Sequence, residues 1–148
     1  MDNQPPATDF ATLDTRNSVA VLDFDAATDE SAVFVGVISE GAVLTSGLIV
    51  RLSWAATSAT SGDCVWDVSF EKTTGQDIDS DSFDTIASGT TTTSGTSGVV
   101  NTTAITITTI DSLAANDCFR LKVTRDADNA NDTMTGDAEL VAVEVRAA

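Results

Sequence analysis

The chain is 148 residues long, which suits one domain large enough to bury a core without disulfides or metals. Its 23 acidic and 7 basic residues give a formal net charge of −16, so its surface would repel nucleic-acid phosphates and anionic membrane surfaces. No apolar run reaches the length of a membrane span. We therefore expect neither nucleic acid nor membrane among its partners.

Residues 1–17 are polar, contain Pro5-Pro6 and show no apolar periodicity. We interpret them as an extended N-terminal arm, either frayed in solution or lying on a neighbouring subunit. Phe10 and Leu13 are the large apolar side chains of this arm and the candidate anchors of a subunit contact. A single domain is expected to span residues 18–148.

Within that domain, apolar residues alternate or cluster in short runs, and Gly, Ser, Thr, Asn and Asp separate the runs. No segment keeps a helical spacing of apolar residues over ten positions. The strands are expected at residues 18–24, 30–39, 48–55, 64–73, 99–110, 117–126 and 137–146. The pattern predicts an all-β fold, an antiparallel sandwich of about eight strands with jelly-roll or Greek-key connections.

Two segments interrupt this pattern. Residues 76–85 are rich in Asp and are expected to form a helical turn or a structured loop. Residues 88–98 consist almost wholly of Ser, Thr and Gly, which predicts a flexible loop or an exposed rim of the domain.

Side chains on the same face of each strand are expected to form one core. Both Trp residues fall in phase with aliphatic neighbours, which favours burial over a role in ligand binding. The expected core comprises Leu22, Phe24, Leu52, Trp54, Trp66, Val68, Phe70, Leu121, Val123, Val141 and Val143.

The two cysteines fall on opposite faces of their strands. Cys64 shares its face with Trp66, and Cys118 shares its face with Arg120. We expect two free thiols, as in a reducing compartment.

The sequence has little that could perform catalysis. It contains no histidine, which excludes Ser-His-Asp and Cys-His sites and imidazole-bound zinc, and it has no phosphate-binding glycine motif. Counting carboxylates leaves a paired-carboxylate hydrolase open, but few aromatic residues are available for a sugar-binding cleft. We expect a protein that is not an enzyme and that needs no cofactor.

Calcium is the one metal for which the sequence offers candidate ligands. Asp77, Asp79 and Asp81 alternate as at the start of a calcium loop, but position six is Ser82 where an EF-hand has Gly. Asp126 and Asp128 begin a second candidate, which also departs from the EF-hand pattern. The alternative for each segment is a solvated acidic loop.

Arg125 is in phase with Phe119, Leu121 and Val123 at the end of its strand. Its guanidinium group is expected at the sheet margin, where it could hold an acidic loop.

Several stretches together resemble a known group of proteins. These are residues 22–25 (LDFD), 66–71 (WDVSFE), 77–83 (DIDSDSF), 125–128 (RDAD) and 135–140 (TGDAEL). The chain is similar, from about Leu22 to Arg146, to small acidic β proteins encoded among the structural genes of tailed bacteriophages. Within that group it looks most like head-decoration, or cement, proteins, although a tail or neck module would share these motifs.

The resemblance implies a jelly-roll homotrimer on the outer capsid surface of the virion, made in the host cytoplasm. Its partners would be the major capsid protein and other copies of itself, with Phe10 and Leu13 as capsid or subunit contacts. The alternative is a binding module of a phage tail or a bacterial surface that recognises a carbohydrate or a receptor. Such a module would need exposed aromatic residues.

Overall fold

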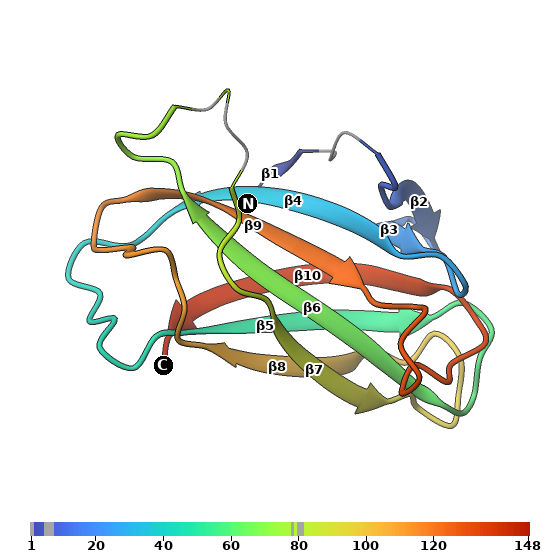
Figure 1. Ribbon diagram of the computed structural model, residues 1–148. Helices are drawn as coiled ribbons and strands as arrows, with labels where there is room; N and C mark the ends of the chain where they lie inside the picture. Colours follow the sequence, from blue (N-terminus) through green and yellow to red (C-terminus); the bar gives the residue numbers. More distant parts are fainter. Residues whose placement is uncertain (1, 5–7, 78, 80–81) are drawn as a thin grey trace.

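The computed structural model describes residues 2–4, 8–77, 79 and 82–148, which form two five-stranded sheets packed face to face (Figure 1). One sheet has the strand order β1-β4-β9-β6-β7, and the other has the order β2-β3-β10-β5-β8. The strands are β1 (Asp2–Gln4), β2 (Thr12–Arg16), β3 (Val19–Phe24), β4 (Glu30–Val37), β5 (Leu48–Ala56), β6 (Asp63–Lys72), β7 (Ala87–Thr92), β8 (Asn101–Ile107), β9 (Cys118–Arg125) and β10 (Ala138–Ala147).

The strand order is that of a jelly roll. Strands β3 to β10 are divided between the sheets as β3-β10-β5-β8 and β4-β9-β6-β7, and all of their pairings are antiparallel. β1 and β2 add one strand to each sheet. The all-β antiparallel sandwich expected from the sequence is confirmed, with ten strands in the described residues where about eight were expected.

The strands predicted from apolar alternation lie where they were expected, with ends that differ by at most three residues. The prediction succeeds because one face of each of these strands is buried in the core, and where residues of both faces are buried, as in β4 and β6, the apolar residues form a short run. No helix occurs among the described residues, and so none that could cross a membrane.

β7 was missed because its inward, half-buried positions carry small or polar residues. Gly89 lies against β8, where an added Cβ would approach Ile105 Cγ1 to 2.6 Å. Thr91 joins a buried chain of hydrogen bonds in which Trp54 Nε1 donates to Thr103 Oγ1 at 2.9 Å, and Thr103 donates to Thr91 Oγ1 at 2.9 Å. The segment read as a flexible loop thus includes a strand that packs closely against the neighbouring sheet.

The boundary placed after residue 17 falls inside a β-hairpin. β2 pairs with β3 along its whole length, and the turn residues Asn17 and Ser18 have φ values of 47° and 65°. Two consecutive positive φ values match a type I′ turn, whose usual sequence is Asn-Gly, so Asn-Ser gave no clear signal. Residues 12–16 therefore pair with the sandwich of their own chain.

The core lies between the sheets. Trp54 and Trp66 are fully buried, and the Trp66 ring lies edge-on to Phe24 with 4.9 Å between ring centroids. Two members of the expected core are only partly buried, Leu22 and Val143. The placement of Val141 in the core was wrong: its side chain is 37% exposed, because the register of β10 against β5 shifts between Leu140 and Ala142.

Candidate functional site

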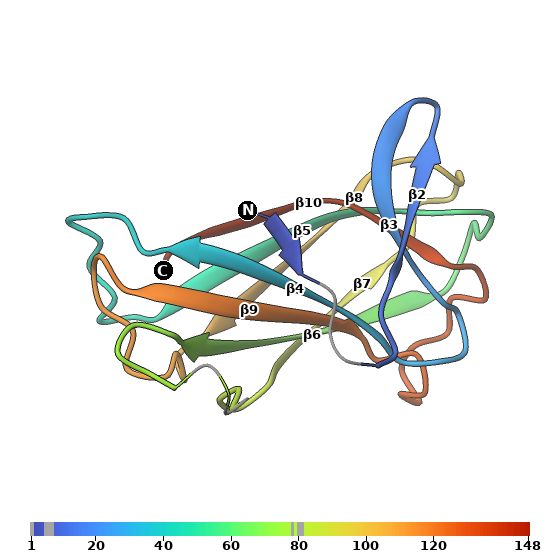
Figure 2. The same cartoon turned by 90° about the horizontal axis from the view of Figure 1, so that it is seen from above.

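The β2–β3 hairpin projects from the rim of the sandwich (Figure 2). β3 pairs with β10 only from Leu22 to Phe24, opposite Ala138–Leu140, and the rest of the hairpin leaves the sheet. The irregularity in β10 at Val141 lies where the two strands part. A wedge therefore opens between the hairpin and β10.

The space between the hairpin and β10 is an apolar groove of about 760 Å³. None of the side chains that line it is charged: Phe10, Ala11, Thr12, Leu13, Ala20, Val21, Leu22, Phe34, Leu140, Val141, Ala142 and Val143. Leu13 is 78% exposed and Phe10 is 49% exposed, so the groove presents large apolar groups to solvent. An exposed apolar patch on a strongly acidic protein indicates a contact surface.

The structure brings the two predicted contact residues, Phe10 and Leu13, into this one groove. The backbone beside Phe10 is held by β4, since Ala11 N donates to Ser31 O at 3.0 Å and Ser31 N donates to Asp9 O at 2.8 Å. Leu13 lies opposite Leu22 in the hairpin. Their backbones are thus fixed within the chain, while their side chains remain accessible to another molecule.

Asp23 lies at the base of the hairpin among other carboxylates. Its pKa is raised to about 6, chiefly by burial and then by the negative charges of Asp137 and Glu139. Its Oδ1 atom is buried without a hydrogen-bond partner in the structure. Glu139, its cross-strand neighbour, forms a salt bridge with Arg16, with 2.5 Å between Nη1 and Oε2.

The second calcium candidate gains a residue that the sequence did not indicate. Carboxylate oxygens of Asp126, Asp128 and Asp29 lie within 4.8 Å of one another. The negative charge of Asp29 is the largest cause that raises the pKa of Asp128. These three are the side chains that could share a divalent cation, and they are exposed or half-buried, as solvated acidic groups also are. Asp29 was missed because it precedes β4, far from the loop in sequence.

The first calcium candidate is described only in part. Asp77 Oδ1 accepts a hydrogen bond from the backbone N–H of Asp79 at 3.1 Å, the local contact of an Asx turn. Asp81 lies outside the described residues. Within the part of the chain that the structure describes, no third acidic group joins Asp77 and Asp79.

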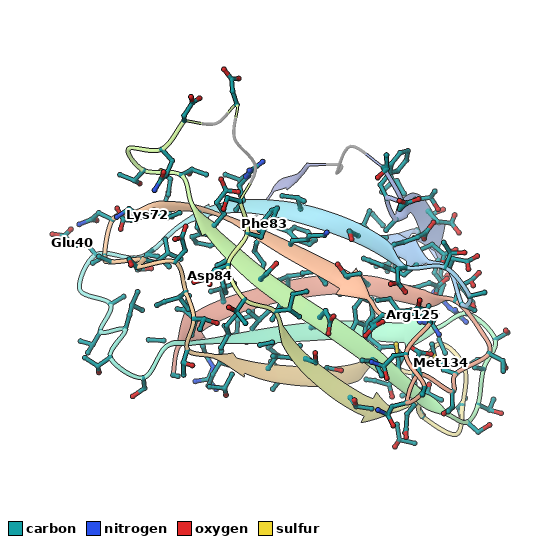
Figure 3. The ribbon with its side chains drawn as sticks, viewed as in Figure 1. Glu40, Lys72, Phe83, Asp84, Arg125 and Met134 are labelled. Atoms are coloured by element: carbon teal, nitrogen blue, oxygen red, sulfur yellow. The ribbon has the colours of Figure 1, made fainter. Side chains whose placement is uncertain are left out.

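Arg125 holds the acidic loop that follows β9, as its position in the sequence predicted (Figure 3). The guanidinium group is fully buried, and its Nη2 lies 2.9 Å from Asp132 Oδ1. It also donates to the backbone carbonyls of Met134 and Gly136, each at 2.8 Å. Asp132 is therefore engaged by Arg125 and does not join the cluster of Asp126 and Asp128.

The cysteines lie as predicted, Cys64 buried and Cys118 exposed, and both are free thiols. Burial raises the pKa of the Cys64 thiol far above its usual range, which makes it a poor nucleophile at neutral pH.

The sheet that contains β6 and β9 carries a small polar pocket of about 160 Å³ on its outer face. Its lining combines Asp67, Ser69, Lys122 and Thr124 of the sheet with Phe83 of the loop that crosses it. The Arg120 guanidinium lies 5.2 Å from the centre of the Phe83 ring, an attractive cation–π contact. Phe83 is therefore an aromatic side chain next to polar groups that could form hydrogen bonds.

No protein-family model matches the chain, and no curated protein matches its sequence. Among solved structures, it is similar to the CBM22-2 xylan-binding domain from Paenibacillus barcinonensis Xyn10C, with 13% identity and a TM-score of 0.51 over 99% of this chain and 91% of that chain. It is also similar to PfGH50B, with 12% identity and a TM-score of 0.51 over 99% of this chain and 23% of that chain. At these identities the likeness shows the β-sandwich fold.

Proposed function

We propose that the protein is a non-enzymatic structural protein of a bacteriophage virion, which decorates and stabilises the capsid as a homo-oligomer. The observation that carries the proposal is the apolar groove beside the β2–β3 hairpin, with Phe10 and Leu13 exposed on a chain of net charge −16. A surface that repels non-specific contacts and offers one apolar patch suits attachment to one protein partner.

Other features support the same proposal. The jelly-roll strand order is the fold that the resemblance to head-decoration proteins implies. The chain has no histidine, and of its two thiols the one in the core, Cys64, is made unreactive by burial. In this proposal the groove receives the major capsid protein.

The experiment is co-sedimentation with undecorated capsids of the phage whose structural genes include this one. Leu13→Glu changes a side chain that is 78% exposed, so it should leave the fold intact and weaken capsid attachment at least tenfold. Val43→Glu, at an exposed loop position outside the groove, is the matched control and should bind as the unchanged protein does. Equal binding by all three proteins, or no binding by any, would contradict the proposal.

A second candidate function is carbohydrate binding, on a phage tail or a bacterial surface. It is favoured by the shared fold with a xylan-binding domain and by the pocket where Phe83 adjoins Asp67 and Lys122. Calorimetry with xylan and other soluble polysaccharides tests it. Binding that Phe83→Ala abolishes, with no attachment to capsids, would favour this candidate over the first.

A further inference from the structure

β10 has an edge that no other strand covers. β3 pairs with it only up to Leu140, whereas β5 continues beside it to Ala147 on the other side. Figure 2 shows this part of β10 along the rim of the sandwich, beyond the departing hairpin. Proteins usually shorten, cover or charge such an edge, because it can pair with another strand.

The pairing with β5 fixes which backbone groups point to the open side. Ala148 N donates to Gly47 O at 3.1 Å, so Arg146 and Glu144, two and four residues earlier, also direct their N–H and C=O groups toward β5. Val143, Val145 and Ala147 therefore direct theirs away from it. Among the described residues, these three have no strand beside them on that side.

The same stretch can pair with itself in only a few ways. If two copies met across a two-fold axis at Val145, Val145 would face Val145, and Val143 would face Ala147 of the second copy. These are the residues whose backbone groups point outward, so the hydrogen-bonding positions coincide. Glu144 would then lie directly opposite Arg146 of the second copy, twice over, on the solvent face of the sheet.

Charge selects this register over its neighbours. An axis at Glu144 would place two Glu144 carboxylates opposite each other, and an axis at Arg146 would do the same with two guanidinium groups. Like charges directly opposite destabilise a pair of strands, and opposite charges stabilise it. An axis at Val143 would bring the second copy against Leu140, where β3 already occupies the edge.

Apolar groups lie along the same edge. Val145 and Ala147 line a groove of about 290 Å³ together with Gly36 and Val37 of β4. Val37 is 61% exposed, and β1 covers the edge of β4 only from Val33 to Val35. An axis at Val145 would bring this groove of each copy toward that of the other.

We propose that a second copy of this chain pairs antiparallel with the open edge of β10, in the register that sets Glu144 opposite Arg146 of the other copy. The pairing joins the two sheets that contain β10 into one continuous sheet across a two-fold axis. It replaces the trimer that the resemblance implies with a two-fold pair, goes beyond the proposed attachment to capsids and does not depend on it.

The test is sedimentation equilibrium of four proteins at micromolar concentrations: the unchanged chain, Glu144→Arg, Arg146→Glu and the double variant. The unchanged chain should form a dimer, and each single variant should associate at least tenfold more weakly. The double variant should regain the dimer, because each Arg at 144 then faces a Glu at 146. An equimolar mixture of the two single variants should form a heterodimer for the same reason.

Glu144→Arg also separates this pairing from a general effect of charge. It makes the net charge less negative and so reduces the repulsion between copies, yet it should weaken the dimer. Asp79→Arg makes the same change of net charge on an exposed loop of the other sheet and should leave the dimer intact. A monomer at every concentration, a trimer, or a dimer that the single variants leave unchanged would overturn the proposal. None of these results depends on whether the protein binds capsids.

Discussion

Asp23 lies among carboxylates at the base of the hairpin, and the pKa of its side chain is raised from 3.8 to about 6. Because the pKa in the folded state is the higher one, protonated Asp23 stabilises the fold below about pH 4, and this contribution is lost as the pH rises through about 6. Asp23→Asn should therefore stabilise the protein at neutral pH, by about 1 kcal/mol once solvent screening of this partly exposed group is allowed for.

Urea unfolding of both proteins at about pH 4 and about pH 7.5 checks this expectation. The gain from Asp23→Asn should be present at the higher pH and nearly absent at the lower one. An equal difference at both pH values would mean that Asp23 ionises normally.

Among the charged residues, we expect the removal of the Arg125 side chain to lower the free energy of unfolding most. Arg125→Ala leaves the Asp132 carboxylate buried without its cation and two carbonyls without their donor, which should cost about 3–5 kcal/mol. Arg51→Ala is the matched control, since Arg51 and Glu144 are both half exposed and 3.8 Å apart, and it should change stability by less than about 1 kcal/mol. Guanidinium unfolding of the two variants measures the difference.

For single residues, the sequence predicted burial or exposure correctly where the position of the residue in its strand determined which face it occupies. That holds for Arg125, for both cysteines and for both Trp residues. It failed for Val141, because a register irregularity reverses the phase of a strand and leaves no mark in the order of residues.

β7 packs tightly against β8 in spite of its loop-like composition. Gly89→Ala should cost about 1–3 kcal/mol, because the new Cβ would lie 2.6 Å from Ile105 Cγ1 in a filled core. Gly95→Ala, where no atom lies within 4 Å of the added Cβ, should change stability by less than about 0.5 kcal/mol. Thermal unfolding followed by circular dichroism compares them, and equal melting temperatures would show that the sheets separate easily at this position.

The strands could be predicted where burial in the core leaves apolar residues in a recognisable order along the chain. Seven strands carry apolar residues in alternation or in a short run, the run being clearest in β4 and β6, where neighbouring residues are buried. β7 does not, because Ala, Gly and Thr fill its inward positions, and β2 does not, because none of its side chains is buried. The groove therefore could not be derived from the sequence: Phe10 and Leu13 could be named, but their meeting with Val141 depends on where the hairpin leaves the sheet.

The charge of the whole molecule gives a further prediction. With 23 acidic and 7 basic residues, repulsion between carboxylates opposes folding at neutral pH. Raising the salt from about 10 mM to about 0.15 M shortens the screening distance from about 30 Å to about 8 Å, so the free energy of unfolding should rise. Urea titrations at several concentrations of NaCl measure it, and a fall with salt would mean that the few ion pairs outweigh the repulsion.

The jelly-roll class was accessible from sequence because long connections between short strands favour crossovers between sheets. The partner was not accessible by the same route. Attachment depends on a few exposed side chains whose arrangement is set by the three-dimensional path of the hairpin.

The buried state of Arg125 also bears on how the protein is digested. Trypsin must take an arginine side chain into its own specificity pocket, and Arg125 has none of its surface free. The peptide bond between Arg125 and Asp126 should therefore resist cleavage while the chain is folded, although an irregular loop follows it. The rate at which a fragment ending at Arg125 appears would then report how often the whole domain opens.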